Sequence, residues 1–168
     1  MVPGEHGQHQ CSCPPGGPKT GPNPTDRGKS GSKYHVLIDG NGLPLVAILT
    51  AANVADTTML EELLDAVPPI HGPLGAPRRR PAKLHADKGY DSKKNREACY
   101  RRRIIPRIAR RGKESSERLG RHRWKVERTQ AWLVNFRKLD PRYGRRADLH
   151  QGFLDLAVSL ILWRYVSK

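Results

Sequence analysis

Long apolar runs are absent from this chain of 168 residues, and their absence limits the class of protein it can be. A membrane-spanning helix needs about 18 to 20 consecutive apolar residues, and the first residues lack the basic-then-apolar order of a secretory signal. Cysteine is scarce: Cys11, Cys13 and Cys99 are an odd number without a long-range pairing pattern, so we expect no disulfide framework. These absences predict a cytoplasmic protein with no membrane partner.

Two further classes lack their usual sequence features. His6, His9, Cys11 and Cys13 lie close together, but zinc sites usually need a second, distant pair of ligands to close a tetrahedron. Aromatic residues make up only 6% of the chain, and no aromatic and glycine platform for stacking RNA bases is evident. The sequence therefore favours neither a zinc protein nor an RNA-binding module.

Positive charge is abundant and unevenly distributed. The formal net charge is +15, yet residues 1–74 carry 4 Lys or Arg against 7 Asp or Glu, whereas residues 75–168 carry 27 against 9. A basic excess of this size, with runs at 78–80 and 101–103, is typical of proteins that bind polyanions. A solvated basic surface is the simpler alternative. Because the runs lie between apolar segments, we expect nucleic acid to be the partner.

The pattern of apolar residues predicts an α/β protein of one folded domain. Residues 1–32 are rich in Gly and Pro and are expected to be disordered, which leaves 33–168 as the domain. Strands are predicted at 34–39 and 44–50 around an Asp-Gly-Asn-Gly turn, and at 82–86 and 104–108. Helices are predicted at 53–67, 92–101 and 121–139, with a loop at 109–120 and a buried final helix at 149–165.

Two carboxylates stand out because each lies among basic and aromatic residues. Asp87 follows a predicted strand, where side chains of α/β sheets meet ligands, and Gly89 permits a sharp turn behind it. Asp87 could equally cap a helix, although Asp91 suits that role better. Glu127 shares a helical face with apolar residues, and its alternative is an ion pair with Arg123 at i, i+4. Paired carboxylates in a basic setting suit Mg²⁺ bound against a phosphate.

Three segments carry a resemblance to a known family. They are GSKYHVLIDGNGLPL at the hairpin, DKGYDS at 87–92, and the RxxxE of Arg123 to Glu127 within WKVERTQAWLVNFRKL. Together they resemble the DDE transposases of bacterial insertion sequences, in the four/five superfamily, from about residue 16 to 165. The resemblance implies a ribonuclease-H-like catalytic core and Mg²⁺- or Mn²⁺-dependent DNA cleavage and strand transfer during transposition.

The resemblance also assigns roles to residues. Asp87 corresponds to the second catalytic acid and Glu127 to the third, and both are implied metal ligands. We expect DNA, at the element ends and at the target, to contact six basic residues: Lys88, Arg101, Arg102, Arg103, Arg123 and Arg128. A homodimer on DNA is a further expectation.

The sequence departs from the family pattern in ways that affect activity. Gly120 and Val134 stand where the pattern has Tyr and Lys, and residues 1–24 contain neither an Asp nor a strand-like run to supply the first acid and first strand. Asp26 and Asp39 lie in loop and turn contexts that suit neither as a replacement. We therefore expect a truncated or frameshifted catalytic domain that is inactive alone, with an upstream-frame fragment as a further partner. The alternative is a non-catalytic DNA-binding remnant.

Overall fold

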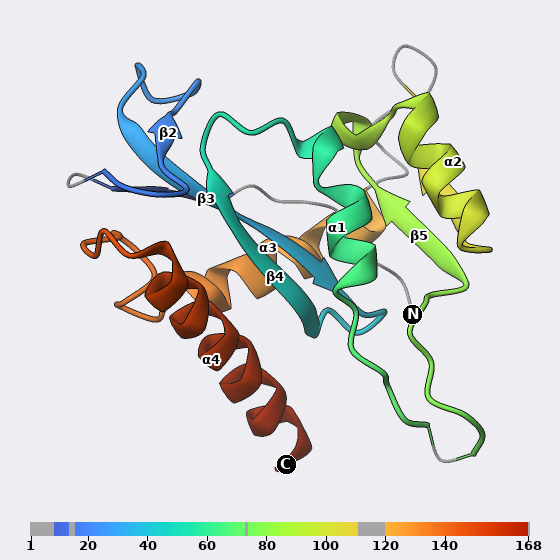
Figure 1. Cartoon of the computed structure of the whole chain (residues 1–168). Coiled ribbons are helices and arrows are strands. Elements are labelled where there is room, and N and C mark those ends of the chain that lie inside the picture. The colour runs from blue at the N-terminus through green and yellow to red at the C-terminus, as the bar shows by residue number, and fades with distance from the viewer. Residues whose placement is uncertain (1–8, 14–15, 73, 111–119, 168) are drawn as a thin grey trace.

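The computed structural model describes residues 9–13, 16–72, 74–110 and 120–167, with only the backbone described at 9 and 120–123 (Figure 1). The predicted mixture of helices and strands is confirmed. In chain order the elements are β1 (His9–Ser12), β2 (Gly21–Pro22), β3 (Ser30–Ile38), β4 (Pro44–Ala51), η1 (Asp56–Thr58), α1 (Leu60–Asp65), β5 (Lys83–Ala86), η2 (Lys88–Tyr90), α2 (Lys93–Arg101), β6 (Ile105–Ile108), α3 (Gly120–Val134) and α4 (Ala147–Val166).

The hairpin of β3 and β4 is the centre of the larger sheet. The two strands pair antiparallel from Ser32 opposite Ala51 to Ile38 opposite Pro44. The Asp39 carboxylate closes the turn by accepting 2.8 Å hydrogen bonds from the backbone N–H groups of Asn41 and Leu43. Such side-chain bonds to the backbone are why Asp is common in turns. The predicted hairpin is confirmed, and β3 begins four residues earlier than the pattern indicated.

The N-terminal segment differs from its prediction. The sequence predicts disorder over residues 1–32, but β1 pairs antiparallel with β3 at residues 31–34, and β2 pairs with the start of β3. Cys11 and Cys13 are buried, with at most 1% of each side chain exposed. The prediction that residues 1–24 hold no strand is therefore wrong for His9–Ser12. This strand carries no acidic residue.

The reason lies in a side chain more than a hundred residues away. Arg142 is fully buried, and its guanidinium donates to the Pro18 carbonyl at 3.0 Å and to the Ser32 hydroxyl at 2.9 Å. The Arg142 backbone N–H also donates to the Ser12 carbonyl at 2.9 Å. A buried guanidinium needs most of its donors satisfied, and this loop supplies them. Composition alone cannot predict order that depends on a distant arginine.

The chain after the hairpin forms a second, two-stranded sheet. β5 and β6 are parallel, with α2 between them in sequence. The predictions for these three elements are confirmed to within two residues. The predicted helix at 53–67 is shorter, because residues 53–55 are not helical, η1 covers only Asp56–Thr58 and α1 spans only Leu60–Asp65.

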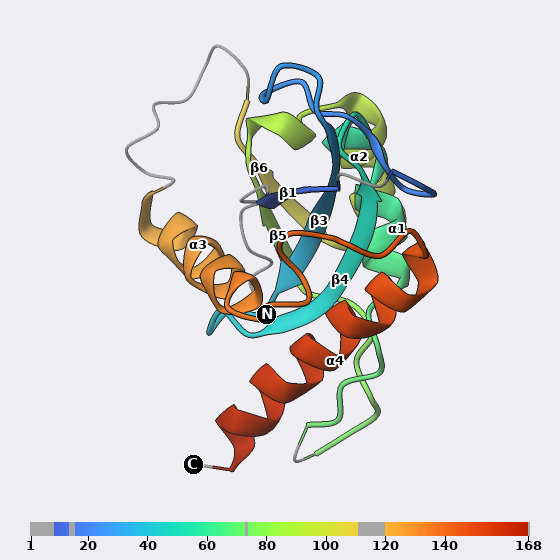
Figure 2. The same ribbon diagram turned by 90° about the vertical axis from the view of Figure 1, so that its left-hand side faces the viewer.

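Two apolar clusters pack on opposite faces of the hairpin. One contains Tyr34, Val36 and Ile38 of β3 with residues of α3 and α4. The other contains Leu37, Val46 and Ile48 with residues of α1, α2, β5 and β6. Alternate residues of a strand point to opposite faces, and Figure 2 shows α3 and α1 on the two sides of the hairpin. The sheet therefore has α3 and α4 on one face and α1 and α2 on the other.

The last helix is only half buried, against the prediction of a fully buried one. Leu154, Ala157, Val158 and Ile161 face the sheet, whereas other large apolar side chains of α4 are exposed. The Gln151 side chain donates to the Ala47 carbonyl at 2.8 Å and accepts from the Leu49 N–H at 2.9 Å. These two bonds cover part of the outer edge of β4, which would otherwise be open to pairing.

Among the helices that the structure describes, none combines the length and the apolar character needed to cross a bilayer. Most of the predicted loop at 109–120 lies outside the described residues.

Candidate functional site

Asp87 directly follows β5, and its carboxylate is bound into the next turn. It is the N-cap of η2, and Asp87 Oδ1 accepts a 2.9 Å hydrogen bond from the Gly89 backbone N–H. Gly89 leaves space for that carboxylate, since a Cβ there would lie 3.0 Å from Asp87 Oδ1. The side chain is half-buried. Asp87 thus lies at the end of a strand as predicted, in a fixed orientation.

The helix cap that the sequence assigns to Asp91 belongs to its neighbour. Ser92 is the N-cap of α2, and its hydroxyl accepts a 3.1 Å bond from the Asn95 backbone N–H. Asp91 instead forms an ion pair with Arg96 at 2.7 Å. Asp87 does act as a cap, but of η2, and this capping role does not exclude a functional one.

A buried polar network lies behind η2 and links it to the hairpin. Lys33 forms a 2.8 Å ion pair with Asp56, and the side chains are only 6% and 12% exposed. His35 Nδ1 lies 3.9 Å from the same carboxylate and 3.4 Å from the Tyr90 hydroxyl. Lys33 and His35 are on β3, Asp56 is on η1, and Tyr90 ends η2. The network therefore connects three elements around the turn that begins with Asp87.

Burial controls the protonation of this network. Desolvation lowers the pKa of His35 to about 4, against the opposing attraction of the Asp56 carboxylate. Burial also raises the pKa of Tyr90 well above its ordinary value, and the negative charges of Asp56 and Asp87 raise it further. At neutral pH the imidazole and the phenol are thus uncharged. The Lys33–Asp56 pair is the charged part of the network.

Glu127 lies on the solvent side of α3, contrary to the prediction that it shares a face with apolar residues. Val126, Thr129 and Leu133 are the buried residues of this helix, whereas Glu127 is exposed. Successive helix residues are about 100° apart, so Glu127 is turned away from the face that packs on the sheet. The Arg123 side chain, its expected ion-pair partner, lies outside the described residues.

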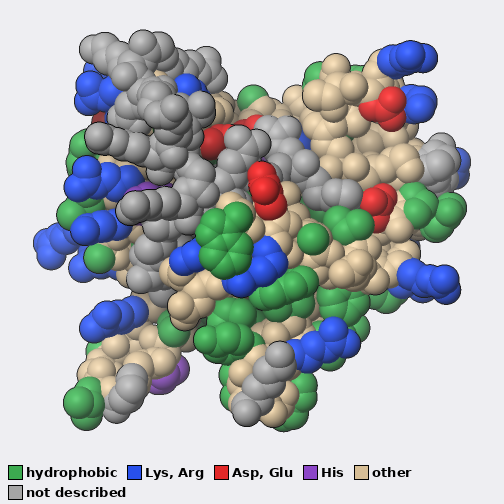
Figure 3. Space-filling view, turned by 180° about the vertical axis from the view of Figure 1, so that it is seen from behind, with side chains coloured by type: hydrophobic (Ala, Val, Ile, Leu, Met, Phe, Trp, Pro, Cys, Tyr) green, Lys and Arg blue, Asp and Glu red, His purple; other side chains and the backbone are tan. Residues whose placement is uncertain are grey.

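Aromatic and basic side chains surround this part of α3. The Arg128 guanidinium carbon lies 4.8 Å from the centre of the Trp124 ring and 4.7 Å from that of Trp132. Figure 3 shows hydrophobic and basic side chains next to one another on this face of the molecule. Cation–π contacts of this kind orient an arginine at modest cost in flexibility. α3 ends at Val134, so the predicted helix to residue 139 is five residues too long.

Three side chains of α3 hold the helix onto the hairpin turn. Lys125 donates to the Gly40 carbonyl at 2.6 Å, Arg128 to the Asn41 carbonyl at 2.5 Å, and Thr129 to the Gly42 carbonyl at 2.5 Å. These bonds fix the part of the helix that carries Glu127. They also show that Arg128, predicted to contact DNA, uses part of its guanidinium within the protein.

The basic residues at the end of α2 fall into two kinds. Arg101 pairs with Glu61 at 3.0 Å, and Arg102 pairs with Asp65 at 2.7 Å, so both connect α2 to α1. The hydrogen bond from Arg102 lowers the pKa of Asp65. Arg103 instead is exposed and lines an open pocket of about 650 Å³ with the arginines of the 78–80 run. Of this predicted triplet, Arg103 is the residue best placed for an external anion.

Asp87, the predicted second acid, and Lys88, a predicted DNA contact, are neighbours in the sequence. Lys88 begins η2 and is half-buried. It therefore lies beside Asp87 at the end of β5, on the same turn.

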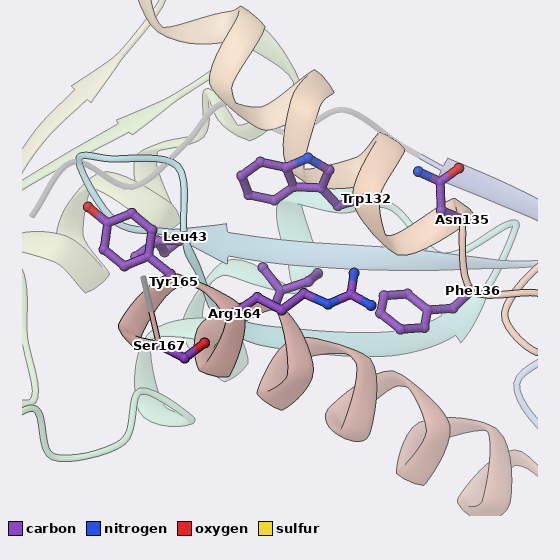
Figure 4. Close-up of a pocket in the computed structure, with 8 residues that line it drawn as sticks. Leu43, Trp132, Asn135, Phe136, Arg164, Tyr165 and Ser167 are labelled. Atoms are coloured by element: carbon purple, nitrogen blue, oxygen red, sulfur yellow. The ribbon is translucent and has the colours of Figure 1, made fainter.

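An apolar groove lies between the C-terminal parts of α3 and α4 (Figure 4). Its volume is about 640 Å³, and it contains neither Asp87 nor Glu127. The residues that line it are Leu43, Trp132, Asn135, Phe136, Ile161, Arg164, Tyr165 and Ser167. The groove is separate from the two predicted acids.

Asp87 and Glu127 each offer carboxylate oxygens of the kind that a hard divalent cation takes. Carboxylate oxygens are the ligands Mg²⁺ prefers, and it often binds through one or two of them together with substrate phosphate. Within the part of the chain that the structure describes, no three His, Cys, Asp or Glu residues are grouped so that they could hold a metal ion. A site of three carboxylates is therefore not formed by the described residues.

Sequence reasoning missed the Lys33–Asp56 pair, although one signal was present. A lysine and a histidine at alternate positions of an apolar strand, as in Lys33 and His35, point to the same face. Buried groups of this kind need partners, so their presence predicts a nearby acid. The identity of that acid, Asp56, depends on tertiary packing.

Comparison with known proteins gives two matches. Residues 5–162 match the model of the family described as the transposase DDE domain. The chain is also 55% identical, over 153 residues, to a candidate transposase of insertion sequence element IS402 from Burkholderia cepacia. That alignment covers 91% of this chain and 72% of the relative.

Proposed function

Because the chain belongs to the DDE transposases of insertion sequences, we propose that it acts on DNA at element ends through divalent-metal-dependent strand cleavage and strand transfer. Asp87 and Glu127 are the carboxylates that we assign to the metal. The observation that carries this assignment is the position of Asp87, which sits at the end of β5 with its carboxylate oriented by the Gly89 N–H.

Each carboxylate contributes in its own way. Asp87 is fixed by the turn, and the buried network behind Tyr90 prevents that turn from shifting. Glu127 is presented from a helix that Lys125, Arg128 and Thr129 attach to the hairpin turn. Bound Mg²⁺ or Mn²⁺ supplies charge stabilisation for an in-line displacement at phosphorus. The protein supplies carboxylate oxygens as ligands.

We further propose a ribonuclease-H-like core. The order of elements supports it: an antiparallel hairpin is followed by parallel β5 and β6 with α2 between them. Helices on both faces of the hairpin are consistent with the same architecture. In this proposal β1 takes only part of the place of a first strand, since its four residues contain no carboxylate.

DNA contacts are assigned by exposure and by the partners each cation has. Arg103 and the 78–80 run form an open basic pocket, while Trp124, which is 50% exposed, lies beside Arg128. Lys88, which follows Asp87 on the same turn, and Arg123, four residues before Glu127 in the sequence, complete the proposed set. Arg101 and Arg102 are assigned weaker contacts with DNA, because each already pairs with a carboxylate of α1. Phosphate contacts of this type give affinity that falls with salt.

A second candidate function is a DNA-binding remnant without catalytic activity. The observation that favours it is the lack of a three-carboxylate group among the described residues. Under the main proposal the chain by itself is inactive for the same reason. The first carboxylate would then come from another polypeptide, and an upstream-frame transposase fragment is the source we propose. A second copy on the same DNA is a further partner.

The experiment is a nicking and strand-transfer assay on element-end DNA, with and without Mg²⁺ or Mn²⁺. The purified chain is assayed alone and with the translated upstream-frame fragment. D87N is the test variant and D91N the matched control, because Asp91 lies four residues further along the chain and forms a half-buried ion pair with Arg96. Metal-dependent product that D87N abolishes and D91N retains supports catalysis.

Two other outcomes decide between the candidates. If the chain binds DNA but forms no product, even with the upstream fragment, the result supports the second candidate, a DNA-binding remnant without catalytic activity. Product that D87N forms at the rate of the unmodified chain contradicts the assignment of Asp87.

A further inference from the structure

The outward face of α4 carries a continuous apolar stripe. Five large side chains on it are between 39% and 68% exposed: Leu149, Phe153, Leu156, Leu160 and Trp163. Their spacing alternates between four and three residues over four intervals. That alternation is the heptad spacing of helices that pair along a seam. At about 1.5 Å per residue the stripe is about 21 Å long.

This stripe is distinct from the face that packs on the sheet. Leu154, Val158 and Ile161 are at most 8% exposed and lie on the opposite side of the helix. Figures 1 and 2 both place α4 at the periphery of the molecule. The helix is therefore apolar on two faces, and the fold covers only one of them. Monomeric proteins rarely expose contiguous apolar surfaces of several hundred Å².

Charge excludes DNA as the molecule that covers this stripe. No Lys or Arg occurs from Ala147 to Trp163, in a chain that holds 31 of them. The charged residues in that range are Asp148 and Asp155, both exposed. A polyanion would be repelled by these carboxylates and would gain nothing from the leucines between them. The partner must be apolar.

Gly152 is an independent indication that another molecule approaches the outward face of α4 closely. It lies within α4 on the exposed side, and a Cβ added there would have nothing within 4 Å. Glycine in a helix interior weakens the helix relative to alanine, and nothing inside the protein requires its small size. A glycine beside an apolar seam lets a second helix come nearer.

We propose that the α4 stripe pairs with the α4 stripe of a second copy of this chain. A heptad seam is complementary to another helix with the same spacing, and among the described helices α4 is the one that carries it. Two copies would together bury on the order of 1,000 Å², close to the lower limit for a specific interface. The α4 stripe is thus the proposed interface of the homodimer suggested above. This proposal does not depend on the assignment of a metal or of catalytic residues.

The test is the mass of the DNA-free chain in solution, by light scattering and sedimentation equilibrium at micromolar concentration. Salt of about 0.5 M removes nucleic acid and leaves apolar association intact. We expect twice the chain mass of 18.9 kDa. L156E should raise the dissociation constant at least about 100-fold, because it places a charge in an apolar seam. L74E is the matched control, since Leu74 is 92% exposed on a loop.

A cross-linking measurement locates the interface. The native thiols Cys11, Cys13 and Cys99 are buried, so L156C adds an exposed one, and a bifunctional maleimide should join two copies through it but not through L74C. A chain that stays at 18.9 kDa, or equal effects of L156E and L74E, overturns the proposal. Because no DNA is present, either result leaves the proposed transposase activity untouched.

Discussion

The two predicted acids are held in different ways. Asp87 begins a turn in which its carboxylate accepts a hydrogen bond from the Gly89 backbone N–H. A buried network of four residues supports that turn: Lys33, His35, Asp56 and Tyr90. We term this network of four residues the Asp87 corner. Glu127 is exposed on α3, and its position depends on three bonds from neighbouring side chains to the hairpin turn. The corner is built from several elements, whereas Glu127 lies on a single helix that is bonded to the hairpin turn and packed on the sheet through Val126 and Leu133.

The two carboxylates are oriented by different parts of the structure. A carboxylate on a short turn has no long element to orient it, so tertiary contacts must do so. The direction of a carboxylate on a helix is set by the helix, so contacts that fix the helix also orient the carboxylate. Substitutions in the corner should therefore disturb the fold as well as the site, while substitutions around Glu127 should have smaller effects on stability.

The largest effect is expected from Asp56→Ala. It leaves the Lys33 ammonium, whose side chain is 6% exposed, without its 2.8 Å partner. Removing one partner of a buried ion pair costs about 3–5 kcal/mol. Chemical denaturation should show that loss, and Asp26→Ala, which removes an exposed pair with Lys29, should show little change. Equal losses in the two variants would mean that the corner is not a buried network.

Acid should destabilise the protein through its buried histidines. The pKa of His35 in the corner and that of His150 in the α4 layer are both lowered by burial to about 4, from an ordinary value near 6.5. The unfolded chain therefore takes up protons first, and the stability from the neutral rings is lost as pH falls from about 6.5 to 4. Each histidine should contribute up to about 1.4 kcal/mol per pH unit.

The measurement is the free energy of unfolding across that pH range. His35→Asn should reduce the slope of this free energy against pH by about the contribution of one histidine. An unchanged slope would show that His35 is not buried in its neutral form.

A smaller loss is expected from Thr129→Val on α3. The buried hydroxyl donates to the Gly42 carbonyl, and removing it leaves that acceptor unsatisfied at a cost of about 1–2 kcal/mol. Thr58→Val is the matched control, because that hydroxyl donates to the Ala55 carbonyl at an exposed site. Thermal unfolding of the two variants compares them directly. A larger loss for Thr58→Val would contradict the anchoring role of Thr129.

The smallest change in stability is expected from Asp87→Asn. Asparagine caps a helical turn about as well as aspartate, and its side-chain oxygen can accept the bond from Gly89. Unfolding should therefore shift by less than about 0.5 kcal/mol. A loss of several kcal/mol would show that Asp87 is mainly structural, and the D87N result in the nicking assay would then lose its meaning.

The sequence predicted the elements that local pattern determines. The hairpin, β5, α2 and β6 follow from apolar periodicity and turn residues, each predicted within a few residues, although the cap of α2 is Ser92 rather than Asp91. β1 could not be predicted, because its order depends on Arg142. The exposed side of α4 was misread since a helix that is apolar all round can be buried or can pair with another molecule.

The features of the candidate site were likewise predicted only where they depend on local sequence. The places of Asp87 after a strand and of Glu127 on a helix were predicted from local sequence, with the family resemblance assigning their roles. The outward direction of Glu127 and the ion pairs of Arg101 and Arg102 were missed, because they depend on how α3 and α2 pack.

Cleavage of the polypeptide by bound iron tests most directly whether Asp87 and Glu127 serve one metal. Fe²⁺ takes the place of Mg²⁺ or Mn²⁺ at oxygen ligands, and with ascorbate and peroxide it cuts the backbone close to where it binds. We expect cuts near residues 87 and 127 together, both lost in D87N and in E127Q and both retained in D91N. Cuts at one position alone, or cuts that survive both substitutions, would contradict a shared metal.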